Sequence, residues 1–377
     1  MKKILIVAMA DSIHTARWLR QFDDDEIEFV LFPSTPHRRI HSLISDHGLK
    51  TVKSKITISK WMKRGGLPLG VLDLLLDNRI RARLLAKLIT AFDPDLIHVM
   101  ETQHSGYLTD RALSAISRKP KLVLSIWGSD LFWFQRFPRH QQKICSLLKR
   151  VDVLLTECQR DEELAKNFGF NGVCIYGVPA SGGFDVQENL NFESSISPSK
   201  RKIVAVKGYS GFVGLGPAAI SAVGRTSDLA HKYRTVVFSA SWRTWFAAKI
   251  VKLRTGLNIE VQMKHSRSLE EMRDLFSDSR VVIGVSKSDG LPATVKEAAF
   301  FGAFPIQTDT SCAGEWFKDR TSILLVPPDS TDALEAAIRT ALLDDDLVDS
   351  AAILNFEIAG SLMNRAAVRS KISLLYD

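Results

Sequence analysis

One stretch, residues 281–302, constrains the fold of this 377-residue chain more than any other. It begins with an uninterrupted apolar run, Val281–Val285, of the kind that forms a buried parallel strand. Gly290 and Pro292 then favour a turn, and from Ala293 the residues favour a helix until Gly302. The stretch therefore predicts a strand, a loop and a helix, which is the repeating unit of an α/β fold with parallel sheets.

Two acids flank this turn. Asp289 stands at the end of the predicted strand, and Glu297 stands about one turn into the predicted helix. The first backbone N–H groups of a helix lack partners and attract phosphate. Here they would belong to Leu291, Ala293, Thr294 and Val295. Amide donors for phosphate and carboxylates for hydroxyls together suit a nucleotide diphosphate-sugar.

The stretch resembles the acid-x7-acid motif of retaining glycosyltransferases that have the GT-B fold and belong to the large family four. The family motif usually reads Glu-Gly, six residues, then Glu-Ala. This chain has Asp289-Gly290 and Glu297-Ala298, so its first acid is one methylene shorter. The residues that follow, Phe301–Asp309 and Ser311–Trp316, match the family's next motifs in order.

The resemblance implies an α/β fold of two Rossmann-like, doubly wound domains that face each other across a cleft. We expect residues 1–180 to form an N-terminal acceptor domain and residues 202–357 to form a nucleotide-sugar-binding domain. Residues 181–201, which are rich in Ser, Gly, Asn and Pro, read as the linker. A C-terminal helix over about residues 358–377 is expected to pack back on the first domain.

The resemblance also implies the donor site. Glu297 would bind the ribose hydroxyls and Asp289 the sugar hydroxyls. The diphosphate would be held by the amides that follow Gly290 and by Lys207, which ends a predicted strand before a glycine-rich loop. Lys264 is expected near the base or the ribose. The donor set is therefore Lys207, Lys264, Asp289, Gly290, Leu291, Ala293, Thr294 and Glu297.

In the first half of the chain, four side chains follow predicted strands. His14 lies in a stretch that resembles the first loop of some family-four enzymes, and His104 opens a later helix. Trp127-Gly128-Ser129-Asp130 resembles the family's His-Gly-x-Asp, with Trp127 in place of His. The acceptor side is therefore predicted to include Trp127, Asp130 and His104, and Trp127 could stack on a sugar. His14 is predicted near the reaction centre.

The excess of basic over acidic residues is confined to the first half of the chain. Residues 1–180 hold 27 basic and 19 acidic residues, a net of +8, whereas residues 181–377 hold 23 of each. A protein surface with an excess of basic residues attracts the phosphates of anionic lipids or nucleic acids. Within residues 56–90 basic and apolar clusters alternate. Two interpretations stay open there, an amphipathic surface for the inner leaflet and a core helix with a solvated basic face.

Several classes of protein are not indicated. No Gly-x-Gly-x-x-Gly follows a strand, so no dinucleotide cofactor is predicted. No Asp-x-Asp follows a strand and no Cys-x-x-Cys occurs, so no metal is predicted. No signal peptide and no apolar run of 18 residues is present, which predicts a cytoplasmic protein. Nucleic-acid binding would explain the charge but not the acidic motif, and is not predicted.

The leading hypothesis is a metal-independent retaining glycosyltransferase. It would move a sugar from a nucleotide diphosphate-sugar to a glycan or lipid-linked acceptor, in surface-polysaccharide or glycolipid assembly, possessing no cofactor of its own. Two alternatives stay open: a nucleotide-sugar 2-epimerase, which shares the fold, and a non-catalytic protein that binds sugar nucleotides.

Overall fold

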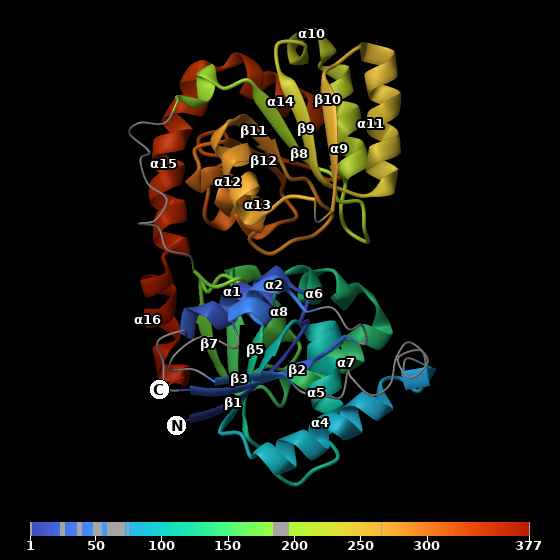
Figure 1. The fold of residues 1–377 in the computed structure, drawn as a ribbon, viewed down its shortest axis with the longest axis vertical. Coiled ribbons are helices and arrows are strands. Elements are labelled where there is room, and N and C mark those ends of the chain that lie inside the picture. Colours follow the sequence, from blue (N-terminus) through green and yellow to red (C-terminus); the bar gives the residue numbers. More distant parts are fainter. Residues whose placement is uncertain are drawn as a thin grey trace. The chain divides into compact units, whose positions relative to one another are not determined.

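The structure is a computed structural model, and it describes residues 2–22, 27–35, 40–47, 55–58, 72–73, 75–183, 196–264 and 266–376. The chain divides into two compact units (Figure 1). Unit 1 comprises Met1–Asp185 with Leu362–Asp377, and unit 2 comprises Val186–Ser361. Among the described residues, no helix is both long enough and apolar enough to cross a bilayer.

Unit 1 is built on a seven-stranded parallel sheet with the order β3-β2-β1-β4-β5-β6-β7. The strands are β1 (Lys2–Ala8), β2 (Ile27–Pro33), β3 (Lys55–Ile58), β4 (Leu96–Met100), β5 (Lys121–Ser125), β6 (Val153–Thr156) and β7 (Val173–Tyr176). The order reverses between β1 and β4. In such sheets ligands bind at the carboxyl ends of the strands beside this reversal.

Helices cover both faces of the unit 1 sheet, because successive residues of each strand are buried against opposite layers. In β1, Leu5 and Val7 belong to one apolar cluster, and Ile4 and Ile6 belong to the other. The helices are α1 (Ile13–Leu19), α2 (Ser42–His47), α4 (Arg79–Phe92), α5 (Tyr107–Leu113), α6 (Ser129–Phe132), α7 (Pro138–Leu148), α8 (Gln159–Asn167) and α16 (Arg365–Tyr376). Shorter turns are η1 (Arg20–Phe22), the π-helix η3 (Thr102–Gly106) and η4 (Phe134–Arg136).

The last helix, α16, completes the core of unit 1. The Tyr376 hydroxyl hydrogen-bonds His98 Nδ1 on β4 and accepts from Trp18 Nε1 at 3.2 Å. All three side chains are buried. Burial holds the pKa of His98 at about 3, so this imidazole is neutral and belongs to the core rather than to a site.

Unit 2 is built on a six-stranded parallel sheet with the order β10-β9-β8-β11-β12-β13. The strands are β8 (Ile203–Lys207), β9 (Arg234–Ala240), β10 (Ile259–Met263), β11 (Ser279–Ile283), β12 (Phe304–Thr308) and β13 (Leu324–Val326). The helices are α9 (Gly216–Arg225), α10 (Ser227–Ala230), α11 (Trp242–Thr255), α12 (Leu269–Ser277), α13 (Ala293–Phe300), α14 (Thr331–Leu343) and α15 (Asp345–Met363), with the turns η7 (Pro198–Lys200) and η8 (Cys312–Glu315).

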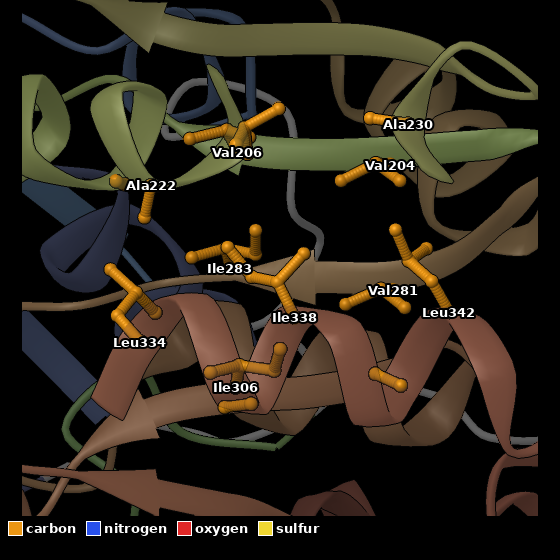
Figure 2. Packing of buried hydrophobic residues seen from close by; sticks show 14 of the residues in the cluster. Val204, Val206, Ala222, Ala230, Val281, Ile283, Ile306, Leu334, Ile338 and Leu342 are labelled. Atoms are coloured by element: carbon orange, nitrogen blue, oxygen red, sulfur yellow. The ribbon is translucent and has the colours of Figure 1, made fainter. Parts of the chain in front are cut away.

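The same alternation builds the two cores of unit 2. Val204 and Val206 of β8 face α9 and α14, and Figure 2 shows Ile338 of α14 packed toward Ile283 of β11. Ile203 and Ala205 belong to the opposite cluster. Two doubly wound parallel sheets are thus confirmed. The order in unit 2 reverses between β8 and β11, the strand that leads into the acid-x7-acid motif.

Residues 196–201, the described end of the predicted linker, are bound to unit 2. The Arg201 guanidinium donates to the carbonyls of Ser279 and Phe301 at 3.2 and 2.9 Å. The Ser199 N–H and hydroxyl donate to Asp349 at 2.8 and 2.6 Å. Residues 184–195 of that segment lie outside the described residues.

The region at residues 56–90 is not one helix. Its described parts include most of β3 and residues 79–90 of α4, while residues 59–71 and 74 lie outside the described residues. Arg81, one of the basic residues of this region, is buried and paired with Asp73, Asn78 and the Ser34 carbonyl, so it is not part of a basic surface. Arg79, Arg83 and Lys87 are exposed along the other side of α4.

Candidate active-site residues at the strand ends of each sheet

Two loops meet at the reversal point of the unit 2 sheet. The glycine-rich loop after β8 and the motif loop after β11 are joined by an isolated antiparallel bridge between Gly214 and Ser286. The Lys287 N–H donates to the Val213 carbonyl at 2.7 Å, and the Leu215 N–H donates to the Val285 carbonyl at 3.3 Å. The two stretches predicted to hold the diphosphate therefore lie against each other.

The motif loop is held from its other side by the residues after β12. The Ser286 carbonyl accepts hydrogen bonds from the hydroxyls of Thr308 and Thr310, at 2.5 and 3.0 Å. The Gly290 carbonyl accepts from the Cys312 N–H at 2.9 Å. Within the loop, Asp289 Oδ1 accepts from the Gly290 N–H at 3.0 Å, and Asp289 remains half-buried. These bonds give the loop a fixed backbone path.

Helix α13 begins at Ala293, as the sequence predicted, and Glu297 is half-buried about one turn from its start. The Pro292 side chain makes no capping bond. Within the described residues, no acceptor bonds the amides of Ala293 and Thr294. One prediction was wrong, because the Val295 N–H donates to the Pro292 carbonyl at 3.0 Å. The amides of Ala293 and Thr294 are thus the two available for an anion.

The two predicted lysines lie at different strands. Lys207 ends β8, next to β11, and is half-buried. An added Cβ at Gly208, the following residue, would lie 2.7 Å from Ala240 Cα, so only glycine fits there. Lys264 follows the edge strand β10, and β9 and β8 separate it from β11, which corresponds to about 14 Å at ordinary strand spacing. The structure does not bring Lys264 to the motif loop.

In unit 1 the predicted residues follow three adjacent strands, β1, β4 and β5, at the reversal point of that sheet. His14 lies at the start of α1, where Ser12 caps the helix, and its ring lies 5.0 Å from that of Trp127. Trp127 is half-buried, and its backbone N–H donates to Asp130 Oδ1 at 2.9 Å. His104 is exposed on η3. The four predicted residues therefore share one edge of the sheet.

Asp130 is buried and joins two of these loops. Its Oδ2 accepts from the Thr102 N–H at 3.0 Å and from the Thr102 hydroxyl at 2.9 Å, in addition to the bond from Trp127. Burial and the nearby charge of Glu101 raise the pKa of Asp130 to about 7. These contacts make Asp130 a residue that positions Trp127, and its contact with an acceptor stays a prediction.

The sequence interpretation missed Glu101. Its φ is 80°, a value rare outside glycine, and its buried carboxylate accepts from the N–H groups of Gln103, His104 and Ser105. Burial raises the pKa of Glu101 to about 7, although these three bonds lower it. Its place directly after the strand Leu96–Met100, three residues before His104, was the signal that could have drawn attention to it.

Comparison with known families assigns one model to each half of the chain. The model "Glycosyl transferase 4-like" matches residues 3–157, and the model "Glycosyl transferases group 1" matches residues 247–353. No curated protein matches this sequence.

Solved structures match the whole chain at low identity. HepE of Anabaena in complex with UDP-glucose is 14% identical, with TM-score 0.72 and coverage of 100% of this chain and 99% of that chain. Sucrose-phosphate synthase of Thermosynechococcus elongatus is 13% identical, with TM-score 0.74 and coverage of 100% and 98%. A UDP-forming α,α-trehalose-phosphate synthase of Burkholderia vietnamiensis is 11% identical, with TM-score 0.70 and coverage of 99% of each chain.

The structural matches establish the fold. The two family models cover the candidate residues of unit 1 and the motif loop after β11, whereas Lys207 and the loop after β8 lie between them. This chain belongs to the family-four-like glycosyltransferases of the GT-B fold.

Proposed function

We propose that the protein is a retaining glycosyltransferase that moves a sugar from a nucleotide diphosphate-sugar to a glycan or lipid-linked acceptor. The observation that supports this most is the junction of the β8 and β11 loops in unit 2. It joins amide donors at the start of α13, the cation of Lys207 on the neighbouring strand and two half-buried acids in one stretch of structure.

In this proposal the amides of Ala293 and Thr294 and the Lys207 ammonium bind the diphosphate. Asp289 accepts from sugar hydroxyls and Glu297 from ribose hydroxyls. As the bond between the anomeric carbon and the phosphate oxygen breaks, these donors stabilise the charge that develops on the diphosphate. The acceptor oxygen forms the new bond on the same face, and its proton passes to the departing phosphate oxygen. No metal and no cofactor is included.

The acceptor is assigned to unit 1. Trp127 would stack on a sugar ring, with His14 beside it and His104 exposed on the same edge of the sheet. Asp130 would hold the Trp127 loop in place. The proposal includes a role in surface-polysaccharide or glycolipid assembly, in the cytoplasm and peripheral to the inner membrane. The resemblance of the motifs and the net charge of +8 in the first half of the chain support it.

The donor is found by a thermal-shift screen of UDP, GDP, ADP and CMP and their sugars. UDP-sugars come first, because the HepE structure holds UDP-glucose. A ligand at a hundredfold excess over its dissociation constant adds about 3 kcal/mol of stability. No shift with any nucleotide would remove the basis for the proposal.

The variants Glu297→Ala and Asp289→Asn then test the site, with Glu270→Ala, an exposed acid of α12, as matched control. Each site variant should lower kcat/KM at least tenfold, since loss of one comparable contact costs about 3 kcal/mol. The control should leave it unchanged. Equal activity of all three proteins contradicts the assignment. Product formed from donor alone would identify a 2-epimerase, and donor binding without turnover on any acceptor would identify a binding protein.

A further inference from the structure

Helix α11 carries the most unusual exposed surface of unit 2. It packs on α9, β9 and β10, with Thr244 and Ala248 buried beneath it, and Figure 1 shows it as the outermost helix of that half of the sheet. Its 14 residues include four basic side chains, Arg243, Lys249, Lys252 and Arg254, and no acidic one.

The outward side of α11 is apolar and aromatic. Trp242, Phe246, Lys249 and Leu253 follow one another at helical spacing, so they share one face, and Trp245 lies beside them. Trp242, Phe246 and Leu253 are 68%, 57% and 85% exposed. Three large aromatic side chains are thus exposed side by side on one helix surface, and such patches mark contact sites.

Cations border this apolar ridge. Arg243 and Arg254 lie on one flank and Lys252 on the other, as the helical period of 3.6 residues dictates. The Arg243 guanidinium lies 5.5 Å from the Trp242 ring, and Lys249 Nζ lies 5.5 Å from the Trp245 ring. A helix that lies in a membrane interface has this pattern: aromatic and aliphatic side chains line the centre of one face, and Lys and Arg side chains lie at its sides.

We propose that α11 docks unit 2 on an anionic lipid bilayer, with its axis parallel to the membrane plane. Tryptophan and phenylalanine rings enter the headgroup region, and the four cations bind lipid phosphates. A second copy of the chain fits this face poorly, because a symmetric pairing would bring eight cations together without an acid. This site differs from the basic stretch at residues 56–90.

The proposed docking helix starts beside the candidate donor loops. The Ser241 N–H, at the α11 start, donates to the Gly208 carbonyl at 3.0 Å, and its hydroxyl bonds that of Ser210. Phe212 in the same loop is 61% exposed. Docking through α11 would therefore bring the carboxyl edge of the unit 2 sheet close to the lipid surface, although the docking itself does not rest on the proposed reaction.

Vesicle flotation of the full chain tests this inference. Vesicles of phosphatidylcholine alone are compared with vesicles that also contain phosphatidylglycerol, at low salt and at about 0.5 M salt. The double variant Lys249→Gln/Arg254→Gln removes two cations, and Phe246→Gln/Leu253→Gln removes two apolar side chains. The matched control is Lys232→Gln/Arg273→Gln, two exposed cations of unit 2 that lie outside α11.

The wild type should bind the anionic vesicles. Each cation near such a surface is worth about fivefold in binding, so the α11 charge variant should bind at least tenfold more weakly. The apolar variant should also lose at least tenfold, because its side chains enter the interface. The Lys232→Gln/Arg273→Gln control should change less than threefold. Thermal midpoints and nucleotide binding without vesicles should stay unchanged in all variants.

Four results of the flotation assay would overturn the inference. They are absence of wild-type binding, equal binding to neutral vesicles, an equal loss in the Lys232→Gln/Arg273→Gln control, and full binding of the Phe246→Gln/Leu253→Gln variant. A dimer that the α11 variants dissociate would assign the face to a second copy and would equally contradict membrane docking. Failure here leaves donor binding and turnover untouched, so it is distinguishable from failure of the proposed function.

Discussion

Gly214 and Ser286 pair as an antiparallel bridge between two loops that are about 70 residues apart in the chain. The bridge links the loops that follow β8 and β11, where the strand order of the unit 2 sheet reverses. Open parallel sheets bind their ligands at such a reversal. Gly214 also lies tightly against Tyr209, since an added Cβ would come within 2.4 Å of the Tyr209 carbonyl oxygen.

Gly214→Ala should therefore displace the glycine-rich loop and lower nucleotide affinity about tenfold, which corresponds to about 1.4 kcal/mol. Gly360→Ala is the matched control, because an added Cβ there meets no atom within 4 Å. Titration calorimetry with the nucleotide found in the donor screen measures both. Equal affinities would show that the bridge does not shape the donor site.

Glu101→Gln should change the pH dependence of stability. The folded state holds the pKa of Glu101 at about 7, above its ordinary value of 4.5, so it favours the protonated acid. The stability that this provides is complete below pH 4.5 and is lost as the pH rises through 7. Glutamine imitates the protonated acid, so the variant should gain about 1–3 kcal/mol relative to wild type between pH 5 and pH 8.

Urea unfolding of the wild type and of Glu101→Gln at both pH values measures this difference. Glu270→Gln, which alters an exposed acid of α12, is the control and should give a constant difference. If the Glu101→Gln curve runs parallel to the wild type, Glu101 is ionised in the folded protein throughout, and its proposed protonation is wrong.

Tyr376→Phe should destabilise unit 1 by about 1–3 kcal/mol, because it leaves two buried groups, His98 Nδ1 and Trp18 Nε1, without their shared partner. Tyr209→Phe, in a more exposed tyrosine of unit 2, should cost less than about 0.5 kcal/mol. Urea unfolding followed by tryptophan fluorescence compares them. A neutral Tyr376→Phe would mean that water replaces the hydroxyl.

Arg280→Met should destabilise unit 2 by about 2–4 kcal/mol. This buried guanidinium donates to the carbonyls of Ala341 and Ser199 at 2.8 and 2.9 Å, and it lies 2.7 Å from Asp345. Asp345→Asn should cost less than about 1 kcal/mol, since that carboxylate is largely exposed. Thermal unfolding of both variants distinguishes the stability that the carbonyl contacts provide from that of the ion pair. An equal loss of stability in the two variants would assign the effect to the ion pair.

Most of the parallel strands could be predicted because their apolar runs are bounded by clear turns. The residues of Arg234–Ala240, Ile259–Met263 and Val173–Tyr176 by themselves predict strands, and these bounds are those of β9, β10 and β7. The short edge strand β3 was missed, since Lys55–Ile58 has only two large apolar residues. The turn residues Gly290 and Pro292 and the helix-favouring residues after them predicted the motif loop and the helix start at Ala293.

Helix α11 was not predicted, and its surface explains why. Apolar residues occupy its outward face as well as its buried face, so no hydrophobic period is visible. The roles of Asp130 and Glu101 depend on contacts between loops distant in sequence, which composition cannot reveal. The individual donor and acceptor contacts of the predicted residues stay predictions.

Unit 1 is made of two separate pieces of chain, and all of unit 2 is encoded between them. During synthesis the first sheet leaves the ribosome well before Tyr376, whose ring fills the space between Phe22, Phe29 and His98. Unit 2 is therefore complete on the ribosome before unit 1, because unit 1 lacks helix α16 until the end of synthesis.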